Sequence, residues 1–358
     1  MNIAQVAPLS ESVPPKQYGG SERIVSYLTE ELIRLGHEVT LFASADSKTG
    51  ARLHPICPHG IRLNKDPFRR DIFLTLLLER AFGSSEFDMI HSHVDFLGFP
   101  FTRRNRTPIL TTVHGKLDLP ELQLVYGEYS EAPLISISYS QRRACPEANW
   151  KTTVYHGIPE RLYSIHAQPG AYLAFLGRIS PEKGPEAAIQ VAKRAGLPLR
   201  IAAKVDPVDR EYFRTVIEPL IAPPFIEYLG EISDHEKDEF LGNACALLCP
   251  FRPEPFGLVL IEALACGTPI VSYAHGSFPE IIDDGVTGYL CRSVDDMVEA
   301  VKRVPQLDRR RCRRTFEERF TAERMAQDYL MAYKELLIEK GRANALSARK
   351  KRQPLPER

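Results

Sequence analysis

The sequence has no surplus of charge of either sign and no long apolar run. Its 46 basic and 46 acidic residues give a formal net charge of 0. Nucleic-acid-binding proteins usually have a basic surplus, so we expect no nucleic-acid partner. The longest apolar stretch, near residues 71–80, is much shorter than the roughly 20 residues that span a bilayer. Residues 1–10 lack the basic start and apolar core of a signal peptide, so we expect a cytoplasmic protein.

Cysteine pairs of the kind that hold a metal or form a disulfide framework are also missing. The 7 cysteines are scattered along the chain and none belongs to a Cys-x-x-Cys motif. Cys245 and Cys249 share an apolar segment, but no third or fourth ligand is near them in sequence, so we interpret both as structural. An odd number of unpatterned thiols is typical of a reducing compartment.

Short apolar segments alternate with amphipathic helical patterns in both halves of the chain. NIAQVA and HEVTLFAS in the first half, like AYLAFLGR and TPIVSYA in the second, are nearly continuous apolar runs. Such runs are expected of strands that are buried on both faces of a parallel sheet. Between them, residues 21–37 place Ile24, Leu28 and Leu32 on one helical stripe. Two successive strand–helix series predict an α/β protein with two facing, doubly wound, Rossmann-like domains and a cleft between them.

The length of 358 residues also suits two domains of roughly 150 residues each. Between residues 158 and 170 the periodic pattern is lost and proline and glycine appear, which predicts a domain boundary there. We expect the domains to span residues 1–162 and 163–320. A helix over 321–340 follows, and the polar, basic stretch 341–358 is predicted to be disordered.

The stretch EPFGLVLIEALACGTP begins at Glu254 and places Glu262 beyond an apolar run. A strand is predicted to end before this stretch and a helix to begin near Phe256 and Gly257, at the sheet edge where parallel strands bind ligands. Glu262 follows Glu254 by eight residues (262 − 254), about two helical turns, so both carboxylates can address one ligand. Carboxylates bind paired sugar hydroxyls well. A solvated loop glutamate and a helix-surface glutamate are the alternative.

Six further motifs accompany EPFGLVLIE in a fixed order. They are YGGSERIV, DMIHSH, TTVHG, FLGRISPEKG, ACGTPIV and HGSFPEIIDDGVTGYL. Over nearly the whole chain they resemble the retaining glycosyltransferases of family 4, which have the GT-B fold. The resemblance implies a retaining, metal-independent hexosyltransferase. Its donor would be a UDP- or GDP-sugar and its acceptor a hydroxyl of a sugar, a lipid-linked sugar or a small molecule, in the synthesis of a glycan, exopolysaccharide, glycolipid or glycoconjugate.

The resemblance also implies roles for individual residues. Glu254 matches the carboxylate that binds sugar hydroxyls near the reacting carbon, and Glu262 matches the one that binds the ribose. Arg178 and Lys183 match the basic pair that binds the diphosphate, where two cations would neutralise the charge of the leaving group. His114 matches a histidine near the transferred sugar. The other donor-binding positions are at the start of the helix that contains Glu262: Phe256, Gly257 and Leu258.

The first domain supplies further candidates. Gly19 and Gly20 lie between its first strand and first helix, where glycine lets the backbone approach a phosphate or sugar; a simple turn is the alternative. Arg23, in the first helical turn, and His93, at the end of DMIHSH, are candidates for the acceptor side. His91, two residues before His93, is interpreted as packing. For His114 read alone, a structural role is the alternative.

Two other functions and one other location remain open. A glycoside phosphorylase of the same fold and a non-catalytic sugar-nucleotide-binding module are the alternative functions. Glycosyltransferases of the other main fold usually bind the donor through a metal ion at an Asp-x-Asp motif, which this sequence lacks, so we expect no metal and no other cofactor. The five arginines of RRRCRR, residues 309–314, favour a solvated helix face, with weak peripheral docking to anionic membrane lipid as the alternative.

Overall fold

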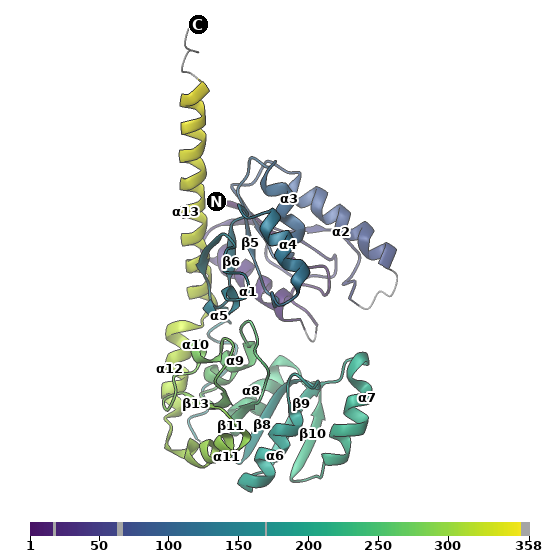
Figure 1. Ribbon diagram of the computed structural model, residues 1–358, viewed down its shortest axis with the longest axis vertical. Coiled ribbons are helices and arrows are strands. Elements are labelled where there is room, and N and C mark those ends of the chain that lie inside the picture. The colour runs from purple at the N-terminus through teal and green to yellow at the C-terminus, as the bar shows by residue number, and fades with distance from the viewer. Residues whose placement is uncertain (17–18, 63–66, 169, 352–358) are drawn as a thin grey trace. The chain divides into compact units, whose positions relative to one another are not determined.

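The computed structural model describes residues 1–16, 19–62, 67–168 and 170–351, which form two α/β units (Figure 1). Unit 1 contains residues 1–137 and 144–154 and the chain from residue 323 onward, and unit 2 contains 138–143 and 155–322. The chain therefore passes from unit 1 to unit 2 eight residues before the expected boundary. The short segment 138–143 also belongs to unit 2, which the sequence did not indicate.

Within the described residues, unit 1 is built on a seven-stranded sheet in the order β3–β2–β1–β4–β5–β6–β7. All of its strand pairs are parallel. The order reverses between β1 and β4, so loops at the carboxyl ends of these two strands diverge and leave room for a ligand. The strands are β1 (Asn2–Val6), β2 (Glu38–Ala43), β3 (Arg52–Pro55), β4 (Met89–Ser92), β5 (Ile109–Thr112), β6 (Leu134–Ser136) and β7 (Trp150–Thr153).

Amphipathic helices cover this sheet. Helix α1 (Gly20–Arg34) buries Ile24, Leu28 and Leu32 completely, which confirms the predicted stripe. The chain leaves this helix through Gly36, whose φ of +84° is a conformation that glycine adopts without strain. The other described helices of unit 1 are α2 (Pro67–Phe82), α3 (Phe99–Thr102), α4 (Pro120–Glu128) and the long C-terminal α13 (Ala322–Lys351). A short 3₁₀ helix, η1 (Asp95–Gly98), directly precedes α3.

Helix α13 binds to the sheet of unit 1 through two fully buried tyrosines, Tyr329 and Tyr333. Their hydroxyls contact Thr112 on β5 and Gln5 on β1. The helix continues to Lys351, whereas the sequence predicted disorder from residue 341. Alanine, leucine, arginine and lysine in residues 342–351 favour helix, and this preference outweighs the polar composition on which the prediction was based. Residues 352–358 of the predicted tail lie outside the described residues.

Unit 2 repeats the architecture with six described strands in the order β10–β9–β8–β11–β12–β13, all parallel. Its order reverses between β8 and β11. The strands are β8 (Tyr172–Arg178), β9 (Leu199–Lys204), β10 (Ile226–Gly230), β11 (Ala244–Cys249), β12 (Ile270–Tyr273) and β13 (Gly288–Cys291). The principal helices are α6 (Pro185–Ala195), α8 (Asp234–Gly242), α9 (Leu258–Ala265), α11 (Val294–Arg303) and α12 (Arg309–Arg319), with the shorter α5 (Tyr139–Arg142), α7 (Arg210–Tyr212) and α10 (Phe278–Ile281). The predicted α/β class with two parallel sheets is confirmed.

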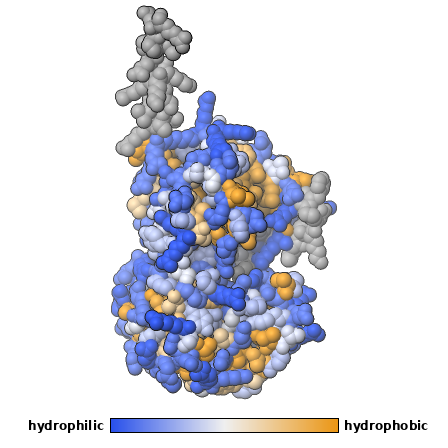
Figure 2. Space-filling model, in the orientation of Figure 1, coloured by the Kyte–Doolittle hydropathy of each residue, from blue (hydrophilic) through white to orange (hydrophobic). Residues whose placement is uncertain are grey.

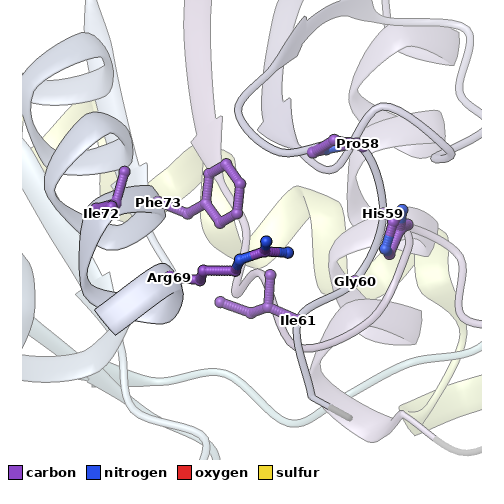
Figure 3. Close-up of a pocket in the computed structure, with 7 residues that line it drawn as sticks. All are labelled: Pro58, His59, Gly60, Ile61, Arg69, Ile72 and Phe73. Atoms are coloured by element: carbon purple, nitrogen blue, oxygen red, sulfur yellow. The ribbon is translucent and has the colours of Figure 1, made fainter. Parts of the chain in front are cut away.

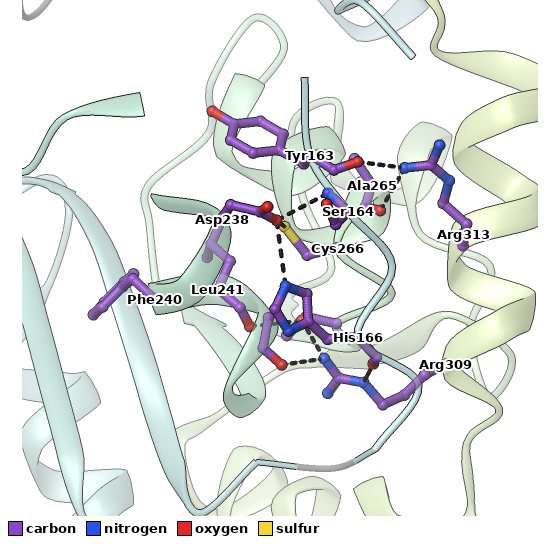
Figure 4. A network of polar contacts seen from close by, with 12 residues as sticks. Tyr163, Ser164, His166, Asp238, Phe240, Leu241, Ala265, Cys266, Arg309 and Arg313 are labelled. Carbon is purple, nitrogen blue, oxygen red and sulfur yellow. Dashed lines mark hydrogen bonds and ion pairs between the residues drawn. The ribbon is translucent and has the colours of Figure 1, made fainter. Parts of the chain in front are cut away.

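Two of the five arginines of the cluster on α12, Arg309 and Arg313, have a structural role (Figure 4). Arg309 is only 5% exposed, and burial without a facing carboxylate lowers its pKa. Arg313 is also mostly buried, with 13% of its side chain exposed. The two guanidinium groups donate to backbone carbonyls of Glu160, Tyr163, His166, Gly242, Ala244 and Ala265 at 2.6–2.9 Å. They therefore attach the segment after the unit boundary to α8, α9 and β11.

The expectation of a solvated arginine face is thus wrong for two of the five arginines. With Arg309 and Arg313 bound to carbonyls, the cluster is smaller than the sequence suggested as a surface for anionic lipid. Figure 2 shows hydrophobic side chains interspersed with hydrophilic ones on the visible face, an ordinary surface for a globular protein. Among the described helices, none has both the length and the apolar composition to cross a membrane.

Candidate functional site

The carboxyl ends of β8 and β11 bring Lys183 and Glu254 together in unit 2. The Lys183 ammonium forms an ion pair with the Glu254 carboxylate, although the residues are 71 positions apart. Both side chains are mostly buried, with exposed fractions of 14% and 19%. The ammonium also lies 4.5 Å from the centre of the Phe251 ring. The structure therefore joins two of the residues that the sequence assigned to the reaction.

Close contact between two loops makes this pair possible. Gly184, directly before α6, has a φ of +60°, and a Cβ there would lie 2.7 Å from the carbonyl oxygen of Pro250. The Arg252 amide also donates to the Glu182 carbonyl at 2.7 Å. On the other side, the Ser277 amide donates to the Glu254 carbonyl at 3.3 Å. The backbone around Glu254 is thus fixed by the loops that follow β8 and β12.

Helix α9 begins beside this pair as predicted, directly after Gly257. Gly257 has a φ of +101°, and a Cβ there would collide with Leu260 at 2.6 Å, so the turn requires glycine. The Phe256 side chain is only 3% exposed and packs against His156, with 5.0 Å between ring centres. The Phe256 side chain is therefore not available to a ligand, and the proposed amide contacts at Phe256, Gly257 and Leu258 stay a prediction.

Glu262 lies inside α9 and is 3% exposed. Its Oε1 accepts from the Lys237 ammonium at 3.0 Å and from the Tyr163 hydroxyl at 3.3 Å. Lys237 is also 3.1 Å from Asp234. A buried carboxylate needs such partners to remain charged, but the sequence pointed to neither of them. Lys237 and Tyr163 come from α8 and from the segment after the unit boundary, and no motif marks them.

Arg178 has a more acidic environment than expected. Its guanidinium lies 2.5 Å from Glu182, 3.6 Å from Asp206 and 3.4 Å from Asp209. Partial burial raises the pKa of Asp209, while the arginine opposes this effect. The structure therefore pairs Arg178 with three carboxylates of its own, separate from the Lys183–Glu254 ion pair. A diphosphate would have to compete with these acids for the guanidinium.

In unit 1, His114 and His93 form a pair at the carboxyl ends of β5 and β4. His114 Nε2 lies 2.9 Å from His93 Nδ1, and His93 Nε2 lies 2.7 Å from Gln5 Oε1. Burial lowers the pKa of His114 to about 4, so its ring is neutral near pH 7. His93 is only 3% exposed, and its place on the acceptor side stays a prediction. His91 is fully buried, in agreement with its interpretation as packing.

The start of α1 contains the predicted glycines and a buried acid that the sequence analysis missed. A Cβ on Gly19 would lie 2.8 Å from Pro15, so packing excludes larger residues, and Gly20 is the first helical residue. Glu22 in the first turn is 5% exposed, and burial raises its pKa. Arg23 is partly buried beside it. Contact of Gly19, Gly20 or Arg23 with a ligand stays a prediction.

Two adjoining cavities of unit 1, with volumes of about 460 and 290 Å³, share Ile61. The larger is mainly apolar, and Figure 3 shows the Arg69 guanidinium extending between Phe73 and Ile61. Pro8 and Ser10, after β1, line the smaller cavity. Arg62, Arg70 and Val94 also line it. Val94 directly follows His93, so this cavity lies at the same sheet edge as the histidine pair. No motif had indicated either cavity.

Comparison with known families agrees with this arrangement. Residues 18–167 match the family described as Glycosyltransferase Family 4, and residues 164–320 match Glycosyl transferases group 1. The chain belongs to glycosyltransferase family 4. The two matches together extend from residue 18 to residue 320 and contain Glu254, Glu262, Arg178, Lys183 and His114. The family predicted from the motifs is confirmed.

Individual proteins show the same relationship. This glycosyltransferase is 26% identical to D-inositol 3-phosphate glycosyltransferase of Mycolicibacterium smegmatis over 81% of this chain and 79% of that protein. The structure of sucrose-phosphate synthase from Thermosynechococcus elongatus has a TM-score of 0.77 and 18% identity, covering 95% of this chain and all of that one. Anabaena HepE, solved in complex with UDP, has a TM-score of 0.72 and 17% identity, with coverages of 94% and 100%. The GT-B fold is thereby confirmed.

Proposed function

We propose that this family 4 glycosyltransferase transfers a hexosyl group from a UDP-sugar to a hydroxyl acceptor, with retention of anomeric configuration and without a metal ion. The Lys183–Glu254 ion pair at the strand ends of unit 2 carries this proposal. A bound donor would separate the pair, with Lys183 on the diphosphate and Glu254 on the sugar hydroxyls. A cation placed before the reaction at the point where the leaving group gains charge stabilises the transition state.

Retention without a protein base is compatible with the groups present. Burial lowers the pKa of His114 to about 4, which makes its ring a weak proton acceptor, and Glu254 would bind the sugar hydroxyls in the donor complex. We infer that a leaving phosphate oxygen takes the proton of the attacking hydroxyl on the same face of the sugar. Glu262, held by Lys237 and Tyr163, would bind the ribose. The UDP in the structurally similar HepE supports a uridine nucleotide, and a GDP-sugar is the alternative donor.

The acceptor proposed here is a hydroxyl compound that carries a phosphate. The small cavity of unit 1 is lined by Arg62 and Arg70, and Arg62 forms an ion pair with Glu11 at 3.7 Å. Arginine is well suited to phosphate because its planar guanidinium forms paired hydrogen bonds. Two of the similar proteins are named for inositol 3-phosphate and sucrose phosphate. These two lines of support are independent of each other.

A transfer assay tests the donor, the acceptor and the reaction together. UDP-glucose, UDP-N-acetylglucosamine and GDP-mannose are each incubated with glucose 6-phosphate, myo-inositol 3-phosphate and their dephosphorylated forms, and nucleotide release and product are followed. We expect transfer with a UDP-sugar and a phosphorylated acceptor, and NMR of the product should show the anomeric configuration of the donor. An inverted product would contradict retention. Cleavage driven by inorganic phosphate would instead indicate a phosphorylase, and binding of nucleotide without release would indicate a binding module.

Arg70→Gln tests the phosphate contact separately. We expect its KM for the phosphorylated acceptor to rise about tenfold, the effect of losing roughly 1.4 kcal/mol of binding, while its KM for the donor stays constant. Arg104→Gln, an exposed arginine at the opposite end of β5, is the matched control. Equal KM values for both variants would contradict the assignment of the cavity.

A further inference from the structure

A buried chain of hydrogen bonds connects His114 with Tyr333 on α13. His114 contacts His93 at 2.9 Å, and His93 contacts the side-chain oxygen of Gln5 at 2.7 Å. The side-chain nitrogen of Gln5 donates to the Tyr333 hydroxyl at 3.3 Å. Gln5 and Tyr333 are fully buried and His93 nearly so. Buried polar groups of this kind are satisfied by hydrogen bonds within the protein.

The Tyr333 hydroxyl fixes the direction of the Gln5 carboxamide. It lies 2.7 Å from Nδ1 of His91, a distance typical of a hydroxyl donor, whereas 3.3 Å to Gln5 is long for such a donor. The hydroxyl hydrogen is therefore assigned to the contact with His91, and this assignment makes Nδ1 of His91 the acceptor. The phenol oxygen then accepts from the Gln5 nitrogen. As a result, the Gln5 oxygen points at His93.

His93 is only 3% exposed, and burying a charged ring is costly, so both rings are assigned as neutral. The fixed oxygen of Gln5 then leaves one arrangement of protons on them. His93 donates from Nε2, because the carboxamide oxygen can only accept. Its Nδ1 then carries a lone pair and accepts from Nε2–H of His114. The remaining nitrogen of His114, Nδ1, has no proton. Burial lowers the pKa of His114 to about 4, which keeps this ring neutral near pH 7.

We propose that Gln5 is a positioning residue that fixes the tautomer of His114, with the proton on Nε2 and an acceptor-only Nδ1. The consequence for the reaction rests on the proposed glycosyl transfer. In this tautomer His114 accepts a hydroxyl hydrogen of a sugar and does not donate a proton to the leaving phosphate from Nδ1. Gln5 acts through His93 and touches no substrate. The tautomer itself is a property of the protein without substrate and can be measured there.

The tautomer is observed in long-range proton–nitrogen correlation spectra of the full-length protein with nitrogen-15 in its 10 histidine rings. Comparison with His114→Gln and His93→Gln assigns the two rings. We expect a protonated Nε2 and a bare Nδ1 for both of them at pH 7. A His114 ring that carries its proton on Nδ1 overturns the proposal, whether or not the protein transfers sugar.

Gln5→Leu tests the cause of the tautomer. This variant removes the acceptor of His93, so the His114 signals should shift toward a mixture of tautomers, and kcat should fall about tenfold with little change in the KM of the donor. Gln123→Leu is the matched control, because Gln123 is an exposed glutamine on α4 whose side chain donates to the carbonyls of Leu117 and Ala144, outside the chain to His114. If Gln5→Leu folds and keeps the wild-type ring signals, Gln5 does not set the tautomer. If it fails to fold, the wild-type spectrum decides.

Discussion

Lys183 and Glu254 form an ion pair between the ends of two neighbouring strands, β8 and β11, although neither is close to the other in sequence. We expect Lys183→Ala to lower kcat on the order of 10²–10³-fold, the usual effect of removing one preorganised charge from a transition state. The remaining Glu254 would also repel the donor diphosphate. Initial-rate measurements at saturating donor check this expectation.

Lys193→Ala is the control for this substitution, because Lys193 is an exposed lysine on α6, the helix that follows Lys183. Its rate should equal that of the wild type. If Lys183→Ala also retained wild-type kcat, the ion pair would have no part in the reaction.

Glu262→Ala should weaken nucleotide binding more than it lowers turnover. It removes a charge-assisted contact worth about 1.5–3 kcal/mol, which corresponds to roughly a 10–100-fold rise in the Kd for UDP. Isothermal titration calorimetry with UDP measures the Kd. Glu239→Ala, at an exposed position on α8, should bind UDP like the wild type. Identical affinities for wild type and Glu262→Ala would remove the ribose assignment.

Transfer should continue in the presence of EDTA. The proposed donor site compensates the diphosphate charge with Lys183 and with Arg178, once the latter is released from its carboxylate partners. The assay compares rates with EDTA, with EDTA followed by excess magnesium, and with EDTA followed by manganese. A rate that is abolished by EDTA and restored by either ion would show that the diphosphate is bound through a metal.

Acid should destabilise unit 1 through His114. Its pKa in the folded protein is lowered to about 4 from 6.5, so between these values the unfolded chain binds a proton that the folded protein does not. Stability is therefore fully present above pH 6.5 and falls as the pH drops toward 4. Urea unfolding at several pH values, followed by the fluorescence of Trp150 in β7, measures the slope.

The variant His114→Gln should show a smaller loss of stability over the same pH range, because it lacks the titrating ring. His235→Gln, at an exposed position in unit 2, should keep the wild-type slope. A wild-type slope in His114→Gln would mean that other groups cause the acid sensitivity.

Arg309→Leu should destabilise unit 2. The substitution leaves the carbonyls of His166, Gly242 and Ala244 without their donor, and each buried group that loses its partner costs about 1–3 kcal/mol. Thermal unfolding followed by circular dichroism measures the change against the wild type. Arg310→Leu, on the exposed side of α12, should change the free energy of unfolding by no more than about 0.5 kcal/mol. Equal effects of both substitutions would contradict the structural role of Arg309.

Much of the architecture could be predicted because the signals are local. The stripe of Ile24, Leu28 and Leu32 defines a buried helical face within one segment, and continuous apolar runs define strands covered on both faces. The place of Glu254, just after a strand and before a helix, also follows from local pattern. Since parallel strands end at one sheet edge, residues in such loops converge without any knowledge of the rest of the fold.

The partners of these residues could not be predicted in the same way. Lys237 and Tyr163 reach Glu262 from segments that carry no motif. Arg309 belongs to a run of charge that resembles a solvated face, yet its environment depends on the carbonyls that the surrounding elements leave at that point. A periodic pattern shows which residues share a face, but not what covers it.

The sequence by itself determined the family, the two parallel sheets and the loops that hold the candidate site, because these depend on local pattern and on motifs. Only the tertiary structure decided that Lys183 pairs with Glu254 and that His114 is bound through His93 to Gln5. The physical reason is that hydrogen bonds and ion pairs act over about 3 Å. Residues far apart in the chain meet at that distance only after packing has placed their backbones.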